Sequence, residues 1–213
     1  FKNSRTDTKN VVFRTHPKCD CVLFRFVLAY DENGKFRYED FKSEDFKVMS
    51  GEDACLKSLT WQIHGIYIVR SEIHKKYPYD ETCRLYSDEN TTRVHYLTSR
   101  EVRQCEGVYY YRQHVASMTH KISVRRFDVL RAKESLMRFL VRNQMSSKVI
   151  TEYENIRWLN VIDTYMFFFA YRNNLTKEER RFGLNEIHRI WRSIDRSCIK
   201  KNLQYKFGFM PFH

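Results

Sequence analysis

The sequence has few residues that break or bend a chain, with only six glycines and three prolines among its 213 residues. Because these residues mark turns and linkers, their scarcity predicts long regular elements joined by few flexible segments. The sequence also has no run of about 18 uncharged apolar residues, the length that a membrane-spanning helix needs. Its most apolar stretch, Met166–Ala170, is too short to span a bilayer and is interpreted as the buried part of a helix.

The first ten residues, FKNSRTDTKN, have neither an initiating methionine nor the apolar segment of a signal peptide. We therefore expect the sequence to be a piece of a longer chain. The six cysteines show no CxxC pair of the kind that structural zinc sites use, which argues against structural zinc. We expect reduced, mostly buried thiols in a cytosolic compartment. These cysteines are Cys19, Cys21, Cys55, Cys83, Cys105 and Cys198.

Apolar and aromatic residues are abundant, at 42% and 15% of the chain, and this content predicts a globular protein with a substantial core. Charged residues make up 30% of the chain, and the mean hydropathy of −0.63 indicates a well-solvated surface. The net charge of +12 favours an anionic partner: nucleic acid, an acidic membrane surface or a phosphate-bearing small molecule. Charge alone does not choose among these, and a basic surface without a dedicated partner is an open alternative.

The first part of the chain alternates strand and helix patterns. Cys19–Tyr30 alternates apolar and polar residues, and the turn sequence DENG at Asp31–Gly34 then predicts a β-hairpin. Ser50 is placed to cap a short helix that runs to Trp61. The further predictions are a strand at His64–Arg70, a polar loop after it, a helix at Glu89–Thr98 and a strand at Glu106–Arg112.

Beyond residue 127 the pattern becomes helical. We predict helices at Asp128–Gln144, Thr151–Asn173 and Thr176–Lys201, the last of which has a capping box and one apolar face. The predicted fold class is α/β. A mixed-sheet domain covers residues 1–127, and a helical C-terminal region covers residues 128–213.

The stretch YSDENTTR, residues 86–93, places two adjacent carboxylates at a predicted helix start. One interpretation is purely structural, because Ser87 is a suitable N-cap and the helix dipole favours Asp88 and Glu89 in the first turn. The functional interpretation is that one carboxylate points into a cleft and accepts a proton from a nucleophile. Arg93, about one turn further on, would pair with a carboxylate or with an anionic ligand.

The stretch GVYYYRQHVASMTH, residues 107–120, predicts an aromatic strand that delivers Arg112 and a polar loop. Arginine and histidine donors at a strand end suit phosphate recognition, although ordinary packing beside a solvated loop is the alternative. A metal site at His114 and His120 lacks a third ligand. In WQIHGIYIVR, residues 61–70, Trp61 is either a flat face for stacking on a sugar or a core residue.

Taken in order, these three stretches resemble one family. The run W-x3-G-x-Y-x2-R, then YSDENTTR, then YYYR-x4-SMTH is similar to the C-terminal half of the GT-A domain in inverting family 2 glycosyltransferases, bacterial enzymes that build capsule, lipopolysaccharide and other surface polysaccharides. The resemblance covers roughly Cys19–Leu140. It implies the C-terminal part of a GT-A-like mixed sheet with flanking helices, followed by a helical tail.

The resemblance also implies roles for single residues. Asp88 matches the catalytic base that deprotonates the acceptor hydroxyl, with Glu89 and Arg93 as its neighbours. The residues that would bind the donor diphosphate or the acceptor include Trp61, Arg112, Ser117 and His120. The sequence departs from the family pattern in two ways. Ser87 replaces the glutamate often found before the catalytic aspartate, and the nucleotide-binding half with its metal-binding DxD motif, expected upstream of Cys19, is missing from this sequence.

The resemblance further implies a nucleotide-sugar donor and a glycan or lipid-linked acceptor. It implies a cytoplasmic location, with peripheral contact between the basic protein and acidic lipids at the inner face of the membrane. A divalent metal, Mn²⁺ or Mg²⁺, is expected for the complete enzyme, but no metal motif is evident in this sequence, and we expect the isolated chain to be inactive.

Two other functions remain open. A non-catalytic module that binds the acceptor or serves as a scaffold would share these sequence features. A basic nucleic-acid-binding protein would explain the charge. However, 26 acidic residues are interleaved with the basic ones, and the sequence has no signature of a nucleic-acid-binding fold. The leading expectation therefore includes no nucleic acid as a partner.

Overall fold

The computed structural model describes residues 12–32, 34–83, 85–113 and 122–204, and the chain divides into two compact units. Unit 1 comprises Phe1–Tyr79 and Thr91–His120, and unit 2 comprises Asp80–Asn90 and Lys121–His213. Helix α4 (Ser87–Thr98) crosses from one unit to the other. The protein is mixed α/β, as expected. The division predicted between residues 127 and 128 stays a prediction.

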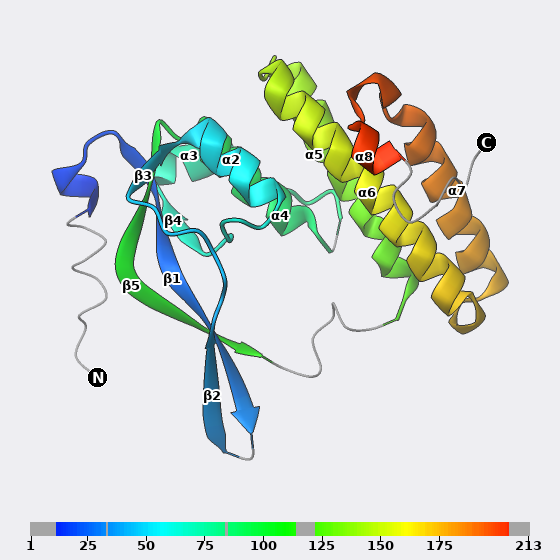
Figure 1. The fold of residues 1–213 in the computed structure, drawn as a ribbon, viewed down its shortest axis with the longest axis horizontal. Coiled ribbons are helices and arrows are strands. Elements are labelled where there is room, and N and C mark those ends of the chain that lie inside the picture. Colours follow the sequence, from blue (N-terminus) through cyan, green and yellow to red (C-terminus); the bar gives the residue numbers. More distant parts are fainter. Residues whose placement is uncertain (1–11, 33, 84, 114–121, 205–213) are drawn as a thin grey trace. The chain divides into compact units, whose positions relative to one another are not determined.

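Unit 1 contains a mixed sheet of five described strands (Figure 1). The strands are β1 (Cys19–Glu32), β2 (Lys35–Asp40), β3 (Val48–Ser50), β4 (Tyr67–Val69) and β5 (Glu101–Gln113). Their order is β2-β1-β5-β3, and β4 pairs with the first part of β1. The β1–β5 pair is parallel, whereas β1–β2, β1–β4 and β3–β5 are antiparallel.

The predicted hairpin is confirmed, with Glu32 opposite Lys35 at the end of the β1–β2 ladder. Gly34 has a φ of 85°, a left-handed conformation that glycine adopts without a steric penalty. Its N–H donates to Asp31 Oδ1 at 3.0 Å, which closes the turn. The strand predicted at Glu106–Arg112 is longer than expected because β5 already begins at Glu101, where it also pairs with β3.

Two helices of unit 1 pack on the sheet through one apolar cluster. Helix α2 (Gly51–Leu59) starts after Ser50, whose Oγ accepts the N–H of Asp53 at 3.1 Å, so the predicted cap is confirmed. Its buried side chains meet those of α4, β1 and β5 in a core of Cys21, Leu23, Ala54, Cys55, Ile63, Tyr96 and Val102. The strand predicted at His64–Arg70 is only the three residues of β4, and the expected polar loop includes the short helix α3 (Ser71–Lys76).

Unit 2 is helical in its described part (Figure 1). Its elements are η2 (Val124–Phe127), α5 (Asp128–Arg142), α6 (Ser147–Tyr171), η3 (Arg172–Asn174), α7 (Lys177–Ser193), η4 (Arg196–Cys198) and α8 (Lys201–Gln204). The predicted capping box of Thr176 and Glu179 is present at the start of α7. Ile187, Ile190 and Ile194 enter the core with Phe127, Trp158 and Ile162, which confirms the predicted apolar face.

The third predicted helix was wrong at its C-terminal end, since α7 stops at Ser193 and not at Lys201. Asp195 explains the early stop. Its Oδ1 accepts two hydrogen bonds from Ser197, one from the backbone N–H at 3.0 Å and one from the hydroxyl group at 2.7 Å. Such local hydrogen bonds between a side chain and the backbone compete with helix continuation.

The six cysteines are free thiols, as expected, and three of them are buried. Burial raises the pKa of Cys55 to about 12, so this thiol stays protonated at neutral pH. None of the described helices has the length and apolar character needed to cross a bilayer.

Candidate functional site

The acidic stretch at residues 86–93 forms the first turns of α4. The helix begins at Ser87 itself, so the expectation that Ser87 precedes the helix as its N-cap was wrong by one position. The Ser87 hydroxyl donates to the carbonyl of Cys83 at 2.7 Å and thereby fixes the loop that enters the helix. Tyr86, the residue before the helix, has a left-handed φ of 70°.

The two adjacent carboxylates have different surroundings. Asp88 is exposed, and its Oδ1 accepts the N–H of Glu89 at 3.0 Å. Glu89 is half-buried, and its Oε2 lies 2.8 Å from the Nζ of Lys133, whose side chain is only 5% exposed. The charge of Glu89 thus faces a buried ammonium group, whereas Asp88 is an exposed residue.

Asn90 anchors this turn of α4 within unit 2, a role that was not predicted. Its Nδ2 donates to Asp80 Oδ2 and to the carbonyl of Ala132, both at 2.7 Å. Burial pushes the pKa of Asp80 up, but hydrogen bonds from Thr82 and Asn90 outweigh this and leave the pKa below its ordinary value. Asp80 therefore stays ionised and holds Asn90 in place, so the backbone that carries Asp88 is firmly fixed.

Arg93 belongs to the part of α4 that lies in unit 1, and only 3% of it is exposed. Its positive charge acts on the buried thiol of Cys55 and moderates the rise in that pKa. The expectation that Arg93 contacts the acceptor or donor stays a prediction.

Trp61 lies on the surface of unit 1 just after α2, with half of its area exposed. The alternative that it is a core tryptophan was therefore wrong. Its φ of 59° is left-handed, and its ring and that of Phe41 form an edge-to-face pair with 6.5 Å between the centroids. The exposed indole face is available for stacking on a sugar ring.

Arg112 lies near the end of β5, opposite the β1–β2 hairpin. It forms an ion pair with Asp31 at 2.7 Å, and its guanidinium lies 5.5 Å from the centre of the Phe36 ring. Both side chains of the ion pair are partly exposed, so an anionic ligand could compete with Asp31. The other predicted loop residues, His114, Ser117, Thr119 and His120, lie outside the described residues.

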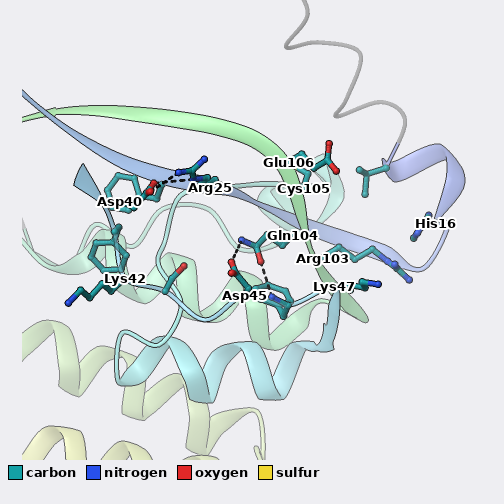
Figure 2. Close-up of a pocket in the computed structure, with 15 residues that line it drawn as sticks. His16, Arg25, Asp40, Lys42, Asp45, Lys47, Arg103, Gln104, Cys105 and Glu106 are labelled. Atoms are coloured by element: carbon teal, nitrogen blue, oxygen red, sulfur yellow. Dashed lines mark hydrogen bonds and ion pairs between the residues drawn. The ribbon is translucent and has the colours of Figure 1, made fainter. Parts of the chain in front are cut away.

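A hollow of about 810 Å³ in unit 1 was not predicted (Figure 2). It contains four basic side chains, Arg25, Lys42, Lys47 and Arg103, and three acidic ones, Asp40, Asp45 and Glu106. Arg25 donates to both carboxylate oxygens of Asp40, at 3.0 and 2.6 Å. None of the described residues predicted for the site lines this hollow. Its charges largely compensate one another.

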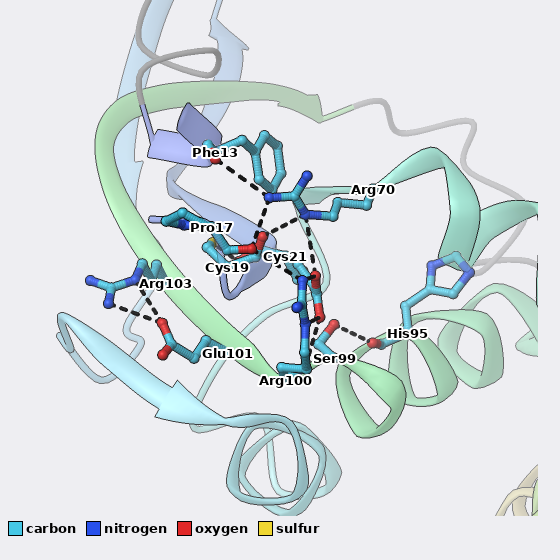
Figure 3. Close-up of polar contacts among 11 residues, drawn as sticks. Phe13, Pro17, Cys19, Cys21, Arg70, His95, Ser99, Arg100, Glu101 and Arg103 are labelled. Carbon is cyan, nitrogen blue, oxygen red and sulfur yellow. Dashed lines mark hydrogen bonds and ion pairs between the residues drawn. The ribbon is translucent and has the colours of Figure 1, made fainter. Parts of the chain in front are cut away.

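Two partly exposed arginines pair with the buried Asp20 and fix the start of β1 (Figure 3). Asp20 is 4% exposed, and its carboxylate accepts three hydrogen bonds from Arg100. The backbone N–H and Nε of Arg100 donate at 2.9 Å, and Nη2 of Arg100 donates at 2.7 Å. Arg70 Nε lies 3.2 Å from Asp20 Oδ1 and donates to the carbonyl of Cys19 at 2.8 Å. Arg70, the arginine that ends the stretch WQIHGIYIVR, thus makes a structural contact.

The tyrosine of the same stretch also has a structural contact. His95 Nε2 donates to the carbonyl of Tyr77 at 2.7 Å, so its Nδ1 accepts from the hydroxyl of Tyr67, also at 2.7 Å. Burial lowers the pKa of His95 despite the hydrogen bond to Tyr77, which keeps the ring neutral. This contact ties β4 to α4 within unit 1.

The divalent metal expected for the complete enzyme was tested against the side chains present. Within residues 12–32, 34–83, 85–113 and 122–204, no three His, Cys, Asp or Glu side chains are grouped so as to hold a metal ion. These residues therefore supply no preformed set of ligands for such a metal. A scan against protein-family models found no match for this chain, and a search of curated proteins found none either.

Proposed function

We propose that this chain forms the acceptor-side part of an inverting glycosyltransferase of GT-A type, in which Asp88 is the general base. The observation that carries the proposal is a difference in exposure between two neighbouring acidic residues: Asp88 is exposed, while Glu89 is half-buried and pairs with the buried Lys133. A helix start that needed acidic residues only for its dipole would not require this difference. The resemblance of three stretches to family 2 glycosyltransferases supports the same role for Asp88.

The proposed chemistry needs a carboxylate of this kind. The hydroxyl of an acceptor sugar is a poor nucleophile, and a base that takes its proton during attack accelerates the reaction about 10²–10⁴-fold. The acceptor oxygen forms a bond to the anomeric carbon as the bond to the donor diphosphate breaks, which inverts the configuration. The proton moves to the carboxylate of Asp88, and the nucleoside diphosphate leaves with the electron pair.

The resemblance also assigns substrate contacts to residues of unit 1, and each of these is proposed for itself. The exposed face of Trp61 suits stacking on a sugar of the acceptor. Arg112 would donate to a phosphate group after exchanging its contact with Asp31. Ser117 and His120 are proposed for donor or acceptor binding from the sequence alone. The substrates would be a nucleotide sugar and a glycan or lipid-linked acceptor of surface polysaccharide synthesis, at the cytoplasmic face of a membrane.

The test uses the full-length product of the gene with a panel of sugar nucleotides, Mn²⁺ and candidate acceptors. Release of nucleoside diphosphate is measured for the parent, for Asp88→Asn and for Glu81→Gln. Glu81 is an exposed carboxylate in the loop before α4 and serves as the matched control. The proposal predicts release by the parent and by Glu81→Gln, and a loss of at least about 100-fold in Asp88→Asn.

Two results would contradict the catalytic role. If Asp88→Asn releases diphosphate as fast as the parent, Asp88 is not the base. If a cooperatively folded parent releases none with any donor and acceptor, the better function is a non-catalytic module that binds the acceptor. The exposed Trp61 favours that second function, and binding of the acceptor glycan by the parent but not by Trp61→Ala would support it.

A further inference from the structure

Unit 2 has a groove of about 620 Å³ between α5 and α7 that is rich in arginine. Six charged side chains line it: Arg131, Glu134, Arg138, Arg142, Glu186 and Arg189. Four guanidinium groups against two carboxylates leave a net charge of two positive units in this small volume. All six lie within unit 2, and Asp88, which also belongs to this unit, is not among the residues that line the groove.

Helical periodicity explains why these side chains gather. On α5, Glu134, Arg138 and Arg142 follow Arg131 at intervals of three, four and four residues, which places all four on one face of the helix. The opposite face of α5 carries buried apolar residues, among them Leu130, Leu136 and Leu140. The polar face of α5 therefore meets Glu186 and Arg189 of α7 across the groove.

Ion pairs order part of the groove. Glu186 accepts from Arg131 at 3.0 Å and from Arg189 at 3.0 Å, and Glu134 accepts from Arg189 at 2.8 Å. Arg138 forms an ion pair with Glu134 at 3.1 Å. Burial pushes the pKa of Glu186 up, but hydrogen bonds from Arg189 and Arg131 outweigh this and lower it below its ordinary value. The carboxylate of Glu186 thus stays ionised, and Arg189 lies between it and Glu134.

The arginines at the C-terminal end of α5 have donors to spare. A guanidinium group has five N–H donors, and Arg138 uses one of them on Glu134. Arg142 makes no ion pair with any residue that the structure describes. Because they are four residues apart on one helix face, their side chains start about 6 Å from each other along the axis. Two exposed guanidinium groups at this spacing can bind one anion together.

We propose that this groove binds a phosphate group, as a phosphomonoester or diphosphate, between Arg138 and Arg142. A dianion matches the excess of two positive charges, whereas a single carboxylate would neutralise only half of it. The planar guanidinium donates two parallel hydrogen bonds to phosphate oxygens, and this geometry favours arginine over lysine for such sites. The phosphate would come from a soluble compound or from a lipid headgroup.

This inference goes beyond the proposed function and does not depend on it. The groove is separate from Asp88, and its test is an equilibrium binding measurement that involves no sugar transfer. Failure of one proposal therefore leaves the other standing.

The experiment compares the chain with two double variants of equal charge. Arg138→Gln with Arg142→Gln removes the proposed contacts, and Arg181→Gln with Arg192→Gln removes two exposed arginines elsewhere on α7. Binding of inorganic pyrophosphate is measured by calorimetry. Binding to phosphatidylcholine vesicles with and without phosphatidic acid is measured by sedimentation. Thermal unfolding of each variant checks that the fold is kept.

We expect the Arg138/Arg142 variant to weaken binding about tenfold or more, and the control variant to change it by less than about threefold. Binding of pyrophosphate would assign a soluble ligand, whereas binding only to vesicles with phosphatidic acid would assign a lipid headgroup. The proposal is overturned if the chain binds neither probe, or if both double variants lose binding equally, since the effect would then be one of net charge.

Discussion

The buried Nζ of Lys133 in α5 lies 2.8 Å from Oε2 of Glu89 in the first turn of α4. This pair separates the two acidic residues that stand side by side in the sequence. It gives Glu89 a structural role within unit 2 and leaves the neighbouring Asp88 directed at solvent.

The first prediction is a difference in stability between two adjacent substitutions. Glu89→Gln removes the carboxylate that faces a buried ammonium group, and should lower the free energy of unfolding by about 2–3 kcal/mol. Asp88→Asn removes an exposed charge and should lower it by less than about 1 kcal/mol. Urea denaturation of both variants measures this difference, and equal losses would refute the assignment of separate roles.

The second prediction concerns the network around Asp20. Asp20→Asn removes the acceptor charge that Arg100 and Arg70 share, and should destabilise the protein by about 2–3 kcal/mol. The matched control is Asp31→Asn, which breaks the partly exposed pair with Arg112 and should cost less than about 1 kcal/mol. Both values come from denaturant unfolding, and a control as damaging as Asp20→Asn would contradict the argument.

The third prediction is a loss of stability in mild acid caused by His64. Burial lowers the pKa of His64 from 6.5 to about 4, although a backbone hydrogen bond with Phe24 opposes this. Between these pH values the unfolded chain binds the proton more readily, so the free energy of unfolding should fall as the pH drops from 6.5 toward 4. The full loss would be about 3 kcal/mol.

His64→Gln tests this prediction, because it removes the titrating ring but keeps a side chain that can accept a hydrogen bond. The free energy of unfolding of the variant should depend less on pH in this window than that of the parent. Some dependence will remain, since burial lowers the pKa of His95 too. Equal slopes in parent and variant would show that His64 is not responsible.

The fourth prediction uses the close approach of α2 and α4 in unit 1. A Cβ atom on Gly51 would lie 2.1 Å from the carbonyl oxygen of Ser99 and 2.3 Å from that of Tyr96. Because backbone atoms cannot move aside easily, Gly51→Ala should destabilise the protein by about 2–3 kcal/mol or more. At Gly34 a Cβ meets nothing within 4 Å, so Gly34→Ala should cost only about 1 kcal/mol of backbone strain. Thermal unfolding of both variants compares these effects.

Local signals accounted for much of the fold. The β1–β2 hairpin, the cap at Ser50 and the capping box of Thr176 each depend on a few neighbouring residues. All three are present as predicted. Contacts between distant residues carried no such signal. Asp20 and Arg100 are 80 residues apart, and Glu89 and Lys133 are 44 apart, so only the folded chain shows that they meet.

Some features of the candidate site could likewise be predicted from local sequence, and others depend on contacts between distant residues. The exposure of Asp88 at a helix start follows from its position in YSDENTTR, a polar stretch with the residue types of a first helical turn. The engagement of Glu89, the anchoring of Asn90 and the burial of Arg93 depend on which face of α4 packs against other elements. The arginine groove of unit 2 could not be predicted from the sequence, because half of its ion pairs join α5 to α7 and depend on how these two helices pack.

The central claim is tested most directly by the transfer rate of the full-length protein with Asp88→Asn at saturating donor and acceptor. The acceptor Kd is measured on the same sample. If Asp88 is the general base, kcat should fall about 10²–10⁴-fold while the acceptor Kd changes by less than about threefold. A variant that keeps the kcat of the parent would contradict the claim and leave Asp88 as an ordinary residue of a helix start.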